Sequence, residues 1–154
     1  MKKAAIAMFK NHLVDKLTAS DYPEILNLWE SSVRATHHFL KEADIQVYKL
    51  LLSNDYLDQL QLYGVRKNNH ILGFIAVSGK QIRLLFILPE ARGMGIGIAL
   101  INYVYQHMGV NEVDVNEQNT QAYDFYQYLG FIVTERSEID AIGKPFPVIS
   151  MKLP

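Results

Sequence analysis

Three glycines lie within five positions, at Gly93, Gly95 and Gly97, between one apolar run and the next. Together with Arg92 they form the pattern Arg-x-x-Gly-x-Gly. Glycines remove side chains where another group must come close to the backbone. Backbone N–H groups of such a loop and of the following helix start point at one spot and favour an anion. The pattern therefore predicts a site for a pyrophosphate held without a metal, and a glycine-rich turn without a ligand is the alternative.

The two common nucleotide-binding loops do not fit this stretch. A P-loop needs Gly-Lys followed by Ser or Thr, but Gly97 is followed by Ile-Ala. A dinucleotide fingerprint needs Gly-x-Gly-x-x-Gly. Counting from Gly93 or Gly95, its last position holds Ile98 or Leu100 instead of glycine. Both classes of nucleotide site are therefore excluded.

A strand before the loop and a helix after it must position this site. Residues 81–89 are apolar in their inner stretch, which predicts a central strand covered on both faces. Ile98, Ile101, Val104 and Met108 recur at helical spacing and predict a helix from the glycine loop onward.

Similar patterns predict the remaining elements. Helices are expected over 21–39, 44–60 and 120–130, and strands over 59–67, 71–79, 112–116, 131–135 and 146–153. This order of elements predicts one α/β (α+β) domain with a single mixed sheet.

Two motifs in this order resemble the main signatures of the GNAT superfamily of N-acetyltransferases. The first is LLFILPEARGMGIGIALI, and the second is VDVNEQNTQAYDFYQYLGF, which contains Asn119, Ala122, the pair Phe125-Tyr126 and Gly130. The similarity spans nearly the whole chain. A further stretch, LWESSVRATHHFL, is similar to the first helix of the small bacterial YjaB-like enzymes of this superfamily. The resemblance implies a mostly antiparallel central sheet flanked by helices, with 12–154 as one N-acetyltransferase domain after a short 1–11 extension.

The resemblance also implies acetyl-CoA as the acyl donor. Amides around Leu85, Phe86 and Ile87 would hydrogen-bond the pantetheine arm as though it were an added strand. One of these amides would face the thioester oxygen and stabilise the charge that develops there. Asn119 would also reach this arm. The residues expected to wrap the pyrophosphate are Arg92, Gly93, Met94, Gly95, Ile96, Gly97 and Ile98.

Two residues receive catalytic roles from the same resemblance. A free lysine-like amine has a pKa near ~10.4, so its deprotonation at neutral pH needs help. Asp114, on the strand 112–116, is the predicted base, directly or through water. Tyr126 is predicted beside the sulfur, where it would protonate the departing thiolate. The alternatives are a solvated strand residue for Asp114 and a packing aromatic for Tyr126.

The acceptor is expected to be a primary amine of a small molecule or a peptide. The early helices would wall its pocket, with weak candidates in Trp29, Thr36 and His38. The pair His37-His38 has no third ligand at metal spacing, and no metal is expected. Because the chain has no cysteine, an acetyl-cysteine intermediate is excluded, and direct transfer in a ternary complex is the simplest route.

Composition limits the remaining possibilities. The 154 residues carry 15 Lys and Arg against 16 Asp and Glu, and this balance argues against a nucleic-acid partner. No apolar run reaches the ~18 residues of a membrane span, so no membrane association and a cytoplasmic location are expected. Either a monomer or a homodimer is compatible with the sequence. Two rival hypotheses stay open: a non-catalytic acyl-CoA-sensing module, and a partner-binding domain without a ligand.

Overall fold

The computed structural model describes residues 12–154, so the predicted 1–11 extension lies outside the described residues. Strands and helices alternate much as the sequence predicts. The strands are β1 (Asp15–Lys16), β2 (Gln61–Lys67), β3 (His70–Ser78), β4 (Gln81–Ile87), β5 (Glu112–Asn116), β6 (Ile132–Ser137) and β7 (Val148–Lys152). The α-helices are α2 (Tyr22–Thr36), α3 (Glu42–Leu51), α4 (Ile96–Met108) and α5 (Thr120–Tyr128).

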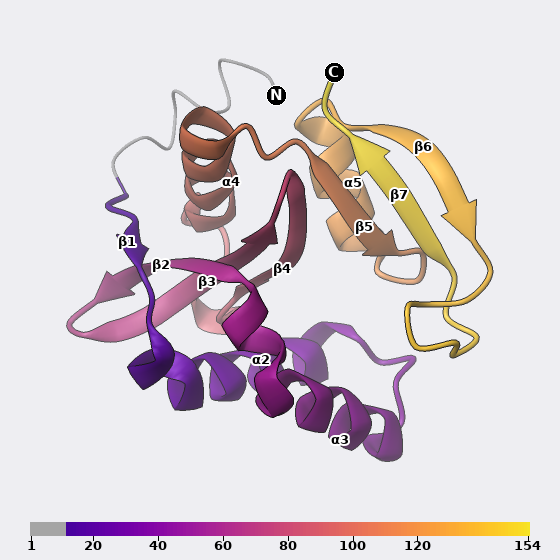
Figure 1. Cartoon of the computed structure of the whole chain (residues 1–154), viewed down its shortest axis with the longest axis horizontal. Helices are drawn as coiled ribbons and strands as arrows, with labels where there is room; N and C mark the ends of the chain where they lie inside the picture. Colours follow the sequence, from indigo (N-terminus) through magenta and orange to yellow (C-terminus); the bar gives the residue numbers. More distant parts are fainter. Residues whose placement is uncertain (1–11) are drawn as a thin grey trace.

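Within residues 12–154 the strands form one sheet in the order β1-β2-β3-β4-β5-β7-β6. Every neighbouring pair is antiparallel except β4 and β5, which run parallel. Figure 1 shows β5, β7 and β6 side by side, apart from the β2–β4 half of the sheet. The predicted mixed, mostly antiparallel sheet flanked by helices is confirmed.

The two faces of the sheet carry separate cores. On one face, α4 and α5 bury side chains such as Leu100, Ile101 and Tyr126 against Val113 and Val115 of β5. On the other face, α2 and α3 bury a second cluster that includes Ile25, Trp29 and Ile45 against Phe74 of β3. Since side chains alternate along a strand, β2, β3 and β4 each contribute to both cores.

The parallel strands β4 and β5 separate soon after they begin. They pair only through Gln81 with Glu112 and Ile82 with Val113. A register shift between Ala76 and Val77 on β3 marks a β-bulge in the β3–β4 pair. Such bulges bend a strand, and β4 beyond the bulge runs on without β5 beside it. The space between the two strands is lined by residues from both faces of the sheet, such as His37 and Tyr126.

The helix predicted over 44–60 is shorter than expected. α3 ends at Leu51 and is followed by an irregular turn over Leu52–Tyr56, in which Asp55 has a φ of 64°. Asn and Asp tolerate this left-handed conformation better than most residues, because their short polar side chains bond locally. The Asn54-Asp55 pair therefore interrupts a helix that the apolar spacing alone would continue.

The described residues contain no helix both long and apolar enough to cross a bilayer.

Candidate active site

The glycine loop forms a backbone cradle at the start of α4. Gly93 and Gly95 have φ values of 79° and 78°, and Gly95 is the N-cap of the helix. The first N–H groups of a helix have no intrahelical partner, so those of Ile96 and its successors face the loop. Arg92 is exposed beside it, and none of the ion pairs within residues 12–154 involves Arg92. The cradle therefore offers both backbone donors and a side-chain cation to an anion.

Gly97 has a different reason to lack a side chain. A Cβ at this position would lie 3.3 Å from Cζ of Phe125. The missing side chain lets α5 approach the first turn of α4. Asn119 starts α5 as its N-cap, with Oδ1 accepting a hydrogen bond from the N–H of Ala122 at 3.2 Å. Asn119 thus positions α5, whatever contact it makes with a ligand.

The open edge of β4 provides a second set of donors. The N–H of Leu88 donates to the carbonyl of Leu72 on β3. Because antiparallel pairs alternate between bonded and non-bonded residues, the amide of Phe86 also faces β3. The amides of Leu85 and Ile87 therefore point into the gap beside β5. The amides of Leu85 and Ile87, and not the amide of Phe86, are therefore placed to hydrogen-bond an extended ligand.

The cradle and this open edge line one cavity of about 420 Å³, called here the cradle cavity. It contains nearly all predicted cofactor residues. Its lining is Ser32, Thr36, His37, Leu85, Phe86, Ile87, Ala91, Arg92, Gly93, Gly95, Ile96, Gly97, Ile98, Asn119, Gln121, Ala122, Phe125 and Tyr126. Met94 is the exception: its side chain is exposed, and its carbonyl contacts Nε2 of His12 at 2.5 Å.

A second cavity of about 120 Å³ lies in the gap between β4 and β5 and is called here the gap cavity. Asp114 and Asn116 of β5 line it, together with Arg83 of β4. The two cavities meet at six residues that line both: His37, Leu85, Phe86, Asn119, Ala122 and Tyr126. A reaction between a ligand in the cradle cavity and one in the gap would occur at this junction.

Tyr126 is buried at the junction. Its ring lies edge-on against Phe125 and Phe131, with ring centroids 5.4 and 5.3 Å away. Burial raises the pKa of the Tyr126 phenol well above its usual value. The hydroxyl therefore stays protonated at neutral pH, as a hydrogen-bond and proton donor must. Tyr126 is both a core aromatic and a lining residue, so the two alternatives for it are not exclusive.

Asp114 lines the gap cavity but not the cradle cavity. It points away from the α4–α5 face, because its neighbours Val113 and Val115 are buried there. Its side chain is exposed and accepts a hydrogen bond from Oγ of Ser150 at 2.7 Å. Asp114 and Tyr126 thus line one gap from opposite faces of the sheet.

The end of α2 brings His37, a residue without a predicted role, to the junction. Ser32, 4% exposed, donates from Oγ to the carbonyl of Ile87 at 3.1 Å and attaches α2 to the end of β4. One turn later Thr36 and His37 line the cradle cavity. The His37 ring contacts the Phe86 ring, with the two ring centroids 6.2 Å apart. The His-His pair was visible in the sequence, but nothing in it indicated which ring turns inward.

The other predicted acceptor contacts lie elsewhere. His38 is exposed and lines neither cavity, since the chain leaves the helix at His37 with a non-helical ψ of 60°. Trp29 is 5% exposed and belongs to the core between α2 and the sheet. Of the three candidates, only Thr36 lines a cavity at the site.

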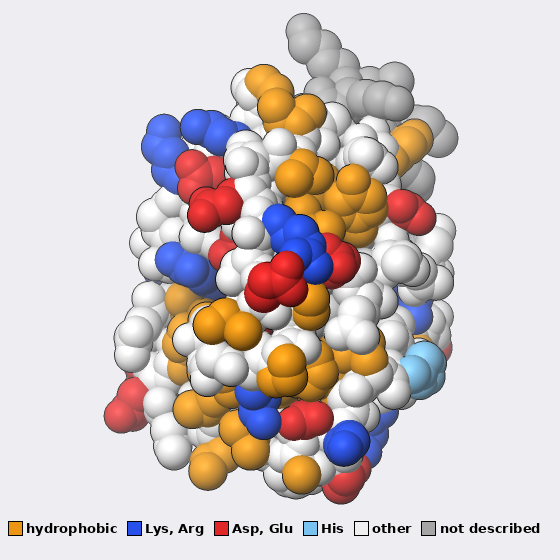
Figure 2. Space-filling model, turned by 90° about the vertical axis from the view of Figure 1, so that its right-hand side faces the viewer, with side chains coloured by type: hydrophobic (Ala, Val, Ile, Leu, Met, Phe, Trp, Pro, Cys, Tyr) orange, Lys and Arg blue, Asp and Glu red, His pale blue; other side chains and the backbone are white. Residues whose placement is uncertain are grey.

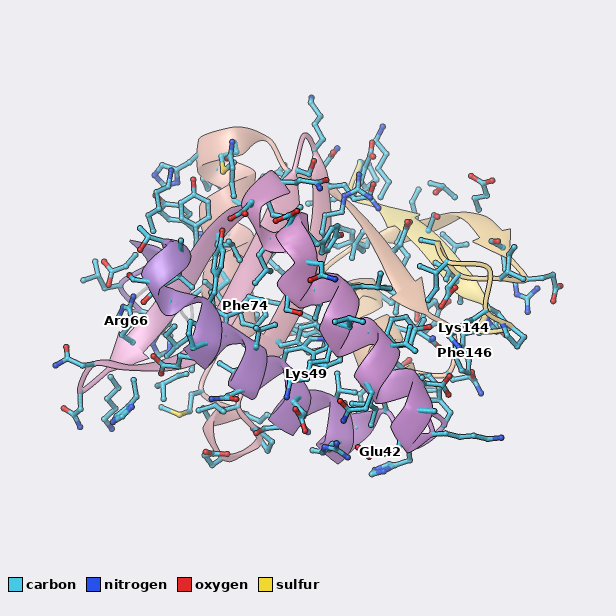
Figure 3. The ribbon with its side chains drawn as sticks, turned by 60° about the horizontal axis from the view of Figure 1, so that its bottom comes forward. Glu42, Lys49, Arg66, Phe74, Lys144 and Phe146 are labelled. Carbon is cyan, nitrogen blue, oxygen red and sulfur yellow. The ribbon has the colours of Figure 1, made fainter. Side chains whose placement is uncertain are left out.

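The β6–β7 connection contacts α3 and the segment that follows α2. Lys144 pairs with Asp44 of α3 at 3.0 Å, and Asp140 accepts a hydrogen bond from Tyr48 of the same helix. The ring centroid of Phe146 lies 5.7 Å from that of Phe39. The Phe39 ring in turn contacts the His37 ring at a centroid distance of 5.4 Å. Figure 3 shows Lys144 and Phe146 beside the helix end that carries Glu42. An aromatic wall thus extends from the junction towards solvent.

The face formed by the later strands carries charges of both signs. Figure 2 shows Lys and Arg interspersed with Asp and Glu and with hydrophobic side chains on this face. Arg136, for example, pairs with both Glu117 and Glu138. The face therefore has no basic stripe of the kind that binds nucleic acid.

Burial, together with the positive charge of Arg92 and the adjacent His38, lowers the pKa of His37 to about 4. Since an unfolded histidine has a pKa near ~6.5, only the unfolded chain takes up this proton as pH falls from about 6.5 to 4. We expect the free energy of unfolding to fall by about 2–3 kcal/mol over this window because of His37 alone. Urea denaturation at a series of pH values measures it.

A matched pair of variants tests this assignment. His37→Asn should remove this part of the pH dependence, whereas His70→Asn, at the exposed start of β3, should retain it. Carboxylates with lowered pKa values, such as Glu42, lose their contribution only near and below their unfolded pKa of ~4.3. An unchanged pH profile in His37→Asn would contradict the assignment.

The backbone cradle, the open strand edge and the junction of the two cavities are compatible with the acyltransferase class that the sequence resembles. Comparison with known proteins agrees with this class. Residues 31–153 match the family model described as an acetyltransferase (GNAT) domain. The chain belongs to the GNAT acetyltransferase family, and the prediction of an N-acetyltransferase fold and enzyme class is confirmed.

Individual relatives make the comparison more specific. The chain is 39% identical over 132 residues to the peptidyl-lysine N-acetyltransferase YjaB of Salmonella typhimurium, covering 85% of this chain and 90% of the relative. The solution structure of apo YjaB from Escherichia coli superposes with a TM-score of 0.83 at 33% identity, covering 91% and 95% of the two chains. The predicted similarity to YjaB-like enzymes is confirmed. The PaiA N-acetyltransferase of Thermoplasma acidophilum, solved with coenzyme A, shares the fold at a TM-score of 0.69 and 19% identity, covering 91% and 98%.

Proposed function

We propose that the protein transfers an acetyl group from acetyl-CoA directly to the side-chain amine of a lysine in a peptide or protein. The observation that carries the proposal is the junction of the cradle cavity with the gap cavity, where a buried phenol meets the open edge of β4. The choice of a peptidyl lysine, rather than a small amine, is supported by the relatives that bear this name.

The residues present fit acetyl-CoA. Gly93 and Gly95 adopt positive φ values that aim loop amides at one spot, with Arg92 beside it for a pyrophosphate. The amides of Leu85 and Ile87 would hydrogen-bond the extended arm. Acetyl-CoA supplies an acetyl group activated as a thioester.

The chain's own residues then orient the two substrates and polarise the thioester. An amide at the open edge of β4, Leu85 or Ile87, donates to the oxygen on which charge develops during attack. Tyr126 donates from its hydroxyl to the departing sulfur, whose thiol pKa near ~8.5 makes it a moderate leaving group. The aromatic wall of Phe86, Phe39 and Phe146 offers an apolar surface for the methylenes of a lysine side chain.

Acetyl-CoA at a hundredfold excess over its Kd is expected to stabilise the protein by about 2.7 kcal/mol. For a chain of this size, such a gain raises Tm by roughly 5–10 °C in a thermal-denaturation experiment. Adenosine, which has neither pyrophosphate nor pantetheine, serves as the control and should shift Tm far less. A protein without an acyl-CoA site, the third hypothesis of the sequence analysis, would show no shift with either compound.

Turnover decides between an enzyme and a sensing module. The protein is incubated with acetyl-CoA and lysine-containing peptides, and mass spectrometry locates the acetyl group on the product. Acetylated lysine side chains are expected, with CoA release in equal amount. A thermal shift with acetyl-CoA but no acetylated peptide or small amine would contradict the proposal and favour the sensing module.

A further inference from the structure

His37 occupies the junction between the two cavities. Among the six residues that line both, only His37 and Tyr126 have titratable side chains, the kind that can accept or donate a proton in catalysis. Tyr126 lies on the α4–α5 face, whereas His37 comes from the end of α2 on the opposite face. The two groups therefore reach the junction from opposite sides of the sheet.

We propose that Nε2 of His37 accepts the proton of the acceptor amine, and that Thr36 positions the ring for this role. The inference rests on the proposed function and adds to it the identity of the base, for which the sequence suggested Asp114.

The hydrogen bonds of Thr36 determine which ring nitrogen is available. Oγ1 of Thr36 donates to the carbonyl of Ser32 at 2.9 Å, which uses its only hydrogen. The contact of 2.8 Å between Oγ1 and Nδ1 of His37 then requires Nδ1 to be the donor. In the neutral ring, Nε2 consequently carries a lone pair. No hydrogen bond within residues 12–154 occupies Nε2.

The ring is adjacent to the open edge of β4. It contacts the ring of Phe86, whose two neighbours, Leu85 and Ile87, present their amides to the gap. An acyl carbonyl held by either amide would lie next to this ring. The ring of Phe39 also contacts the imidazole, with the two ring centroids 5.4 Å apart.

The charged surroundings keep the ring neutral before reaction. Burial, Arg92 from the loop before α4 and the adjacent His38 all lower the pKa of His37. The other ionisable groups that share the gap cavity with it are Arg83 of β4, Asp114 of β5 and Tyr126 of α5. A pyrophosphate on Arg92 would offset that cation and make His37 more basic in the complex than in the free protein.

Asp114 is the less suitable base on geometric grounds. It lines only the gap cavity, it is exposed, and its carboxylate already accepts a hydrogen bond from Ser150. His37 lines both cavities and has an unoccupied Nε2.

Protons and bonds balance over the proposed transfer. The ammonium of the lysine gives one proton to Nε2 of His37, and its freed electron pair forms the N–C bond to the acetyl carbon. As the C–S bond breaks, Tyr126 protonates the sulfur. The nitrogen then loses its second proton to solvent, and the Tyr126 phenolate regains a proton from solvent. His37 also releases its proton to solvent. One proton is released for each acetyl group transferred.

His37→Asn tests the proposal against Asp114→Asn and the control His70→Asn. An asparagine amide retains a donor near the place of Nδ1 but offers no base. We expect His37→Asn to lower kcat/KM at least tenfold at neutral pH. The difference in kcat/KM between this variant and the wild type should decrease by up to tenfold for each unit of rising pH, because solvent then deprotonates the amine. His70→Asn should stay within a few-fold of the wild type. Asp114→Asn, which alters the lining of the gap cavity, should keep the pH profile of the wild type.

Nitrogen NMR of the free protein gives a second readout that does not depend on activity. The His37 ring should show the Nδ1–H tautomer, which Thr36→Ser retains and Thr36→Val loses. An Nε2–H tautomer in the wild type would overturn the proposal. So would a His37→Asn enzyme with the rate and pH profile of His70→Asn. A wild-type protein that acetylates no amine would instead overturn the proposed function, and this inference with it.

Discussion

Replacing Tyr126 with phenylalanine is expected to lower kcat by roughly 10²- to 10⁴-fold, the usual contribution of a positioned acid. The ring would keep its edge-on contacts with Phe125 and Phe131, so the fold and the Kd for acetyl-CoA should change little. Because burial raises the pKa of the phenol, the hydroxyl is neutral throughout the assay range. The loss should therefore be similar from about pH 6 to 9. Steady-state kinetics with a peptide acceptor measures it.

Tyr123→Phe is the matched control for this variant. Tyr123 lies one turn earlier on α5, where its hydroxyl accepts a hydrogen bond from Gln127 at 3.3 Å, and it lines neither cavity. Its turnover should equal that of the wild type. A Tyr126→Phe enzyme with wild-type kcat would show that the phenol only fills the core.

Gly93→Ala should weaken acetyl-CoA binding by roughly 10- to 100-fold. Gly93 has a φ of 79°, a conformation that costs a residue with a Cβ roughly 1–2 kcal/mol. Relaxation of that strain would turn the loop amides away from the pyrophosphate. Each hydrogen bond to a charged group contributes roughly 1.5–3 kcal/mol, so the loss of one accounts for the expected change. Isothermal titration calorimetry with CoA measures the Kd.

Gly109→Ala separates strain from binding. Gly109 ends α4 with a φ of 67°, and, as at Gly93, a Cβ there would meet nothing within 4 Å. Both variants should lose similar stability, but only Gly93→Ala should lose affinity. Equal Kd values for the two variants would mean that the loop amides do not hold the ligand.

The sequence predicted the elements that depend on local patterns. The apolar run of β4, the strand EVDVN and the helical spacing after the glycine loop all appear at or within a few residues of their predicted positions. Asn68 and Asn69 form the β2–β3 turn with positive φ values, as an Asn pair suits. These features follow from backbone preference and periodicity, which act over a few residues. The break at Asn54-Asp55 shows the limit of this reasoning, because apolar spacing outweighed turn chemistry in the prediction.

The sequence by itself predicted the glycine loop as an anion site, since glycine spacing and the failure of two nucleotide motifs left few other ligands for that loop. Tertiary structure alone decided which groups share the junction. The amides of Leu85 and Ile87 are open because β5 separates from β4 after residue 82. His37 rather than His38 turns inward because α2 ends there, and Ser32 attaches this helix to Ile87, 55 residues further along the chain. Strand register decides which β4 amides face the gap, and the end of α2 decides which histidine faces the junction. Both outcomes depend on contacts between residues that are distant in the sequence.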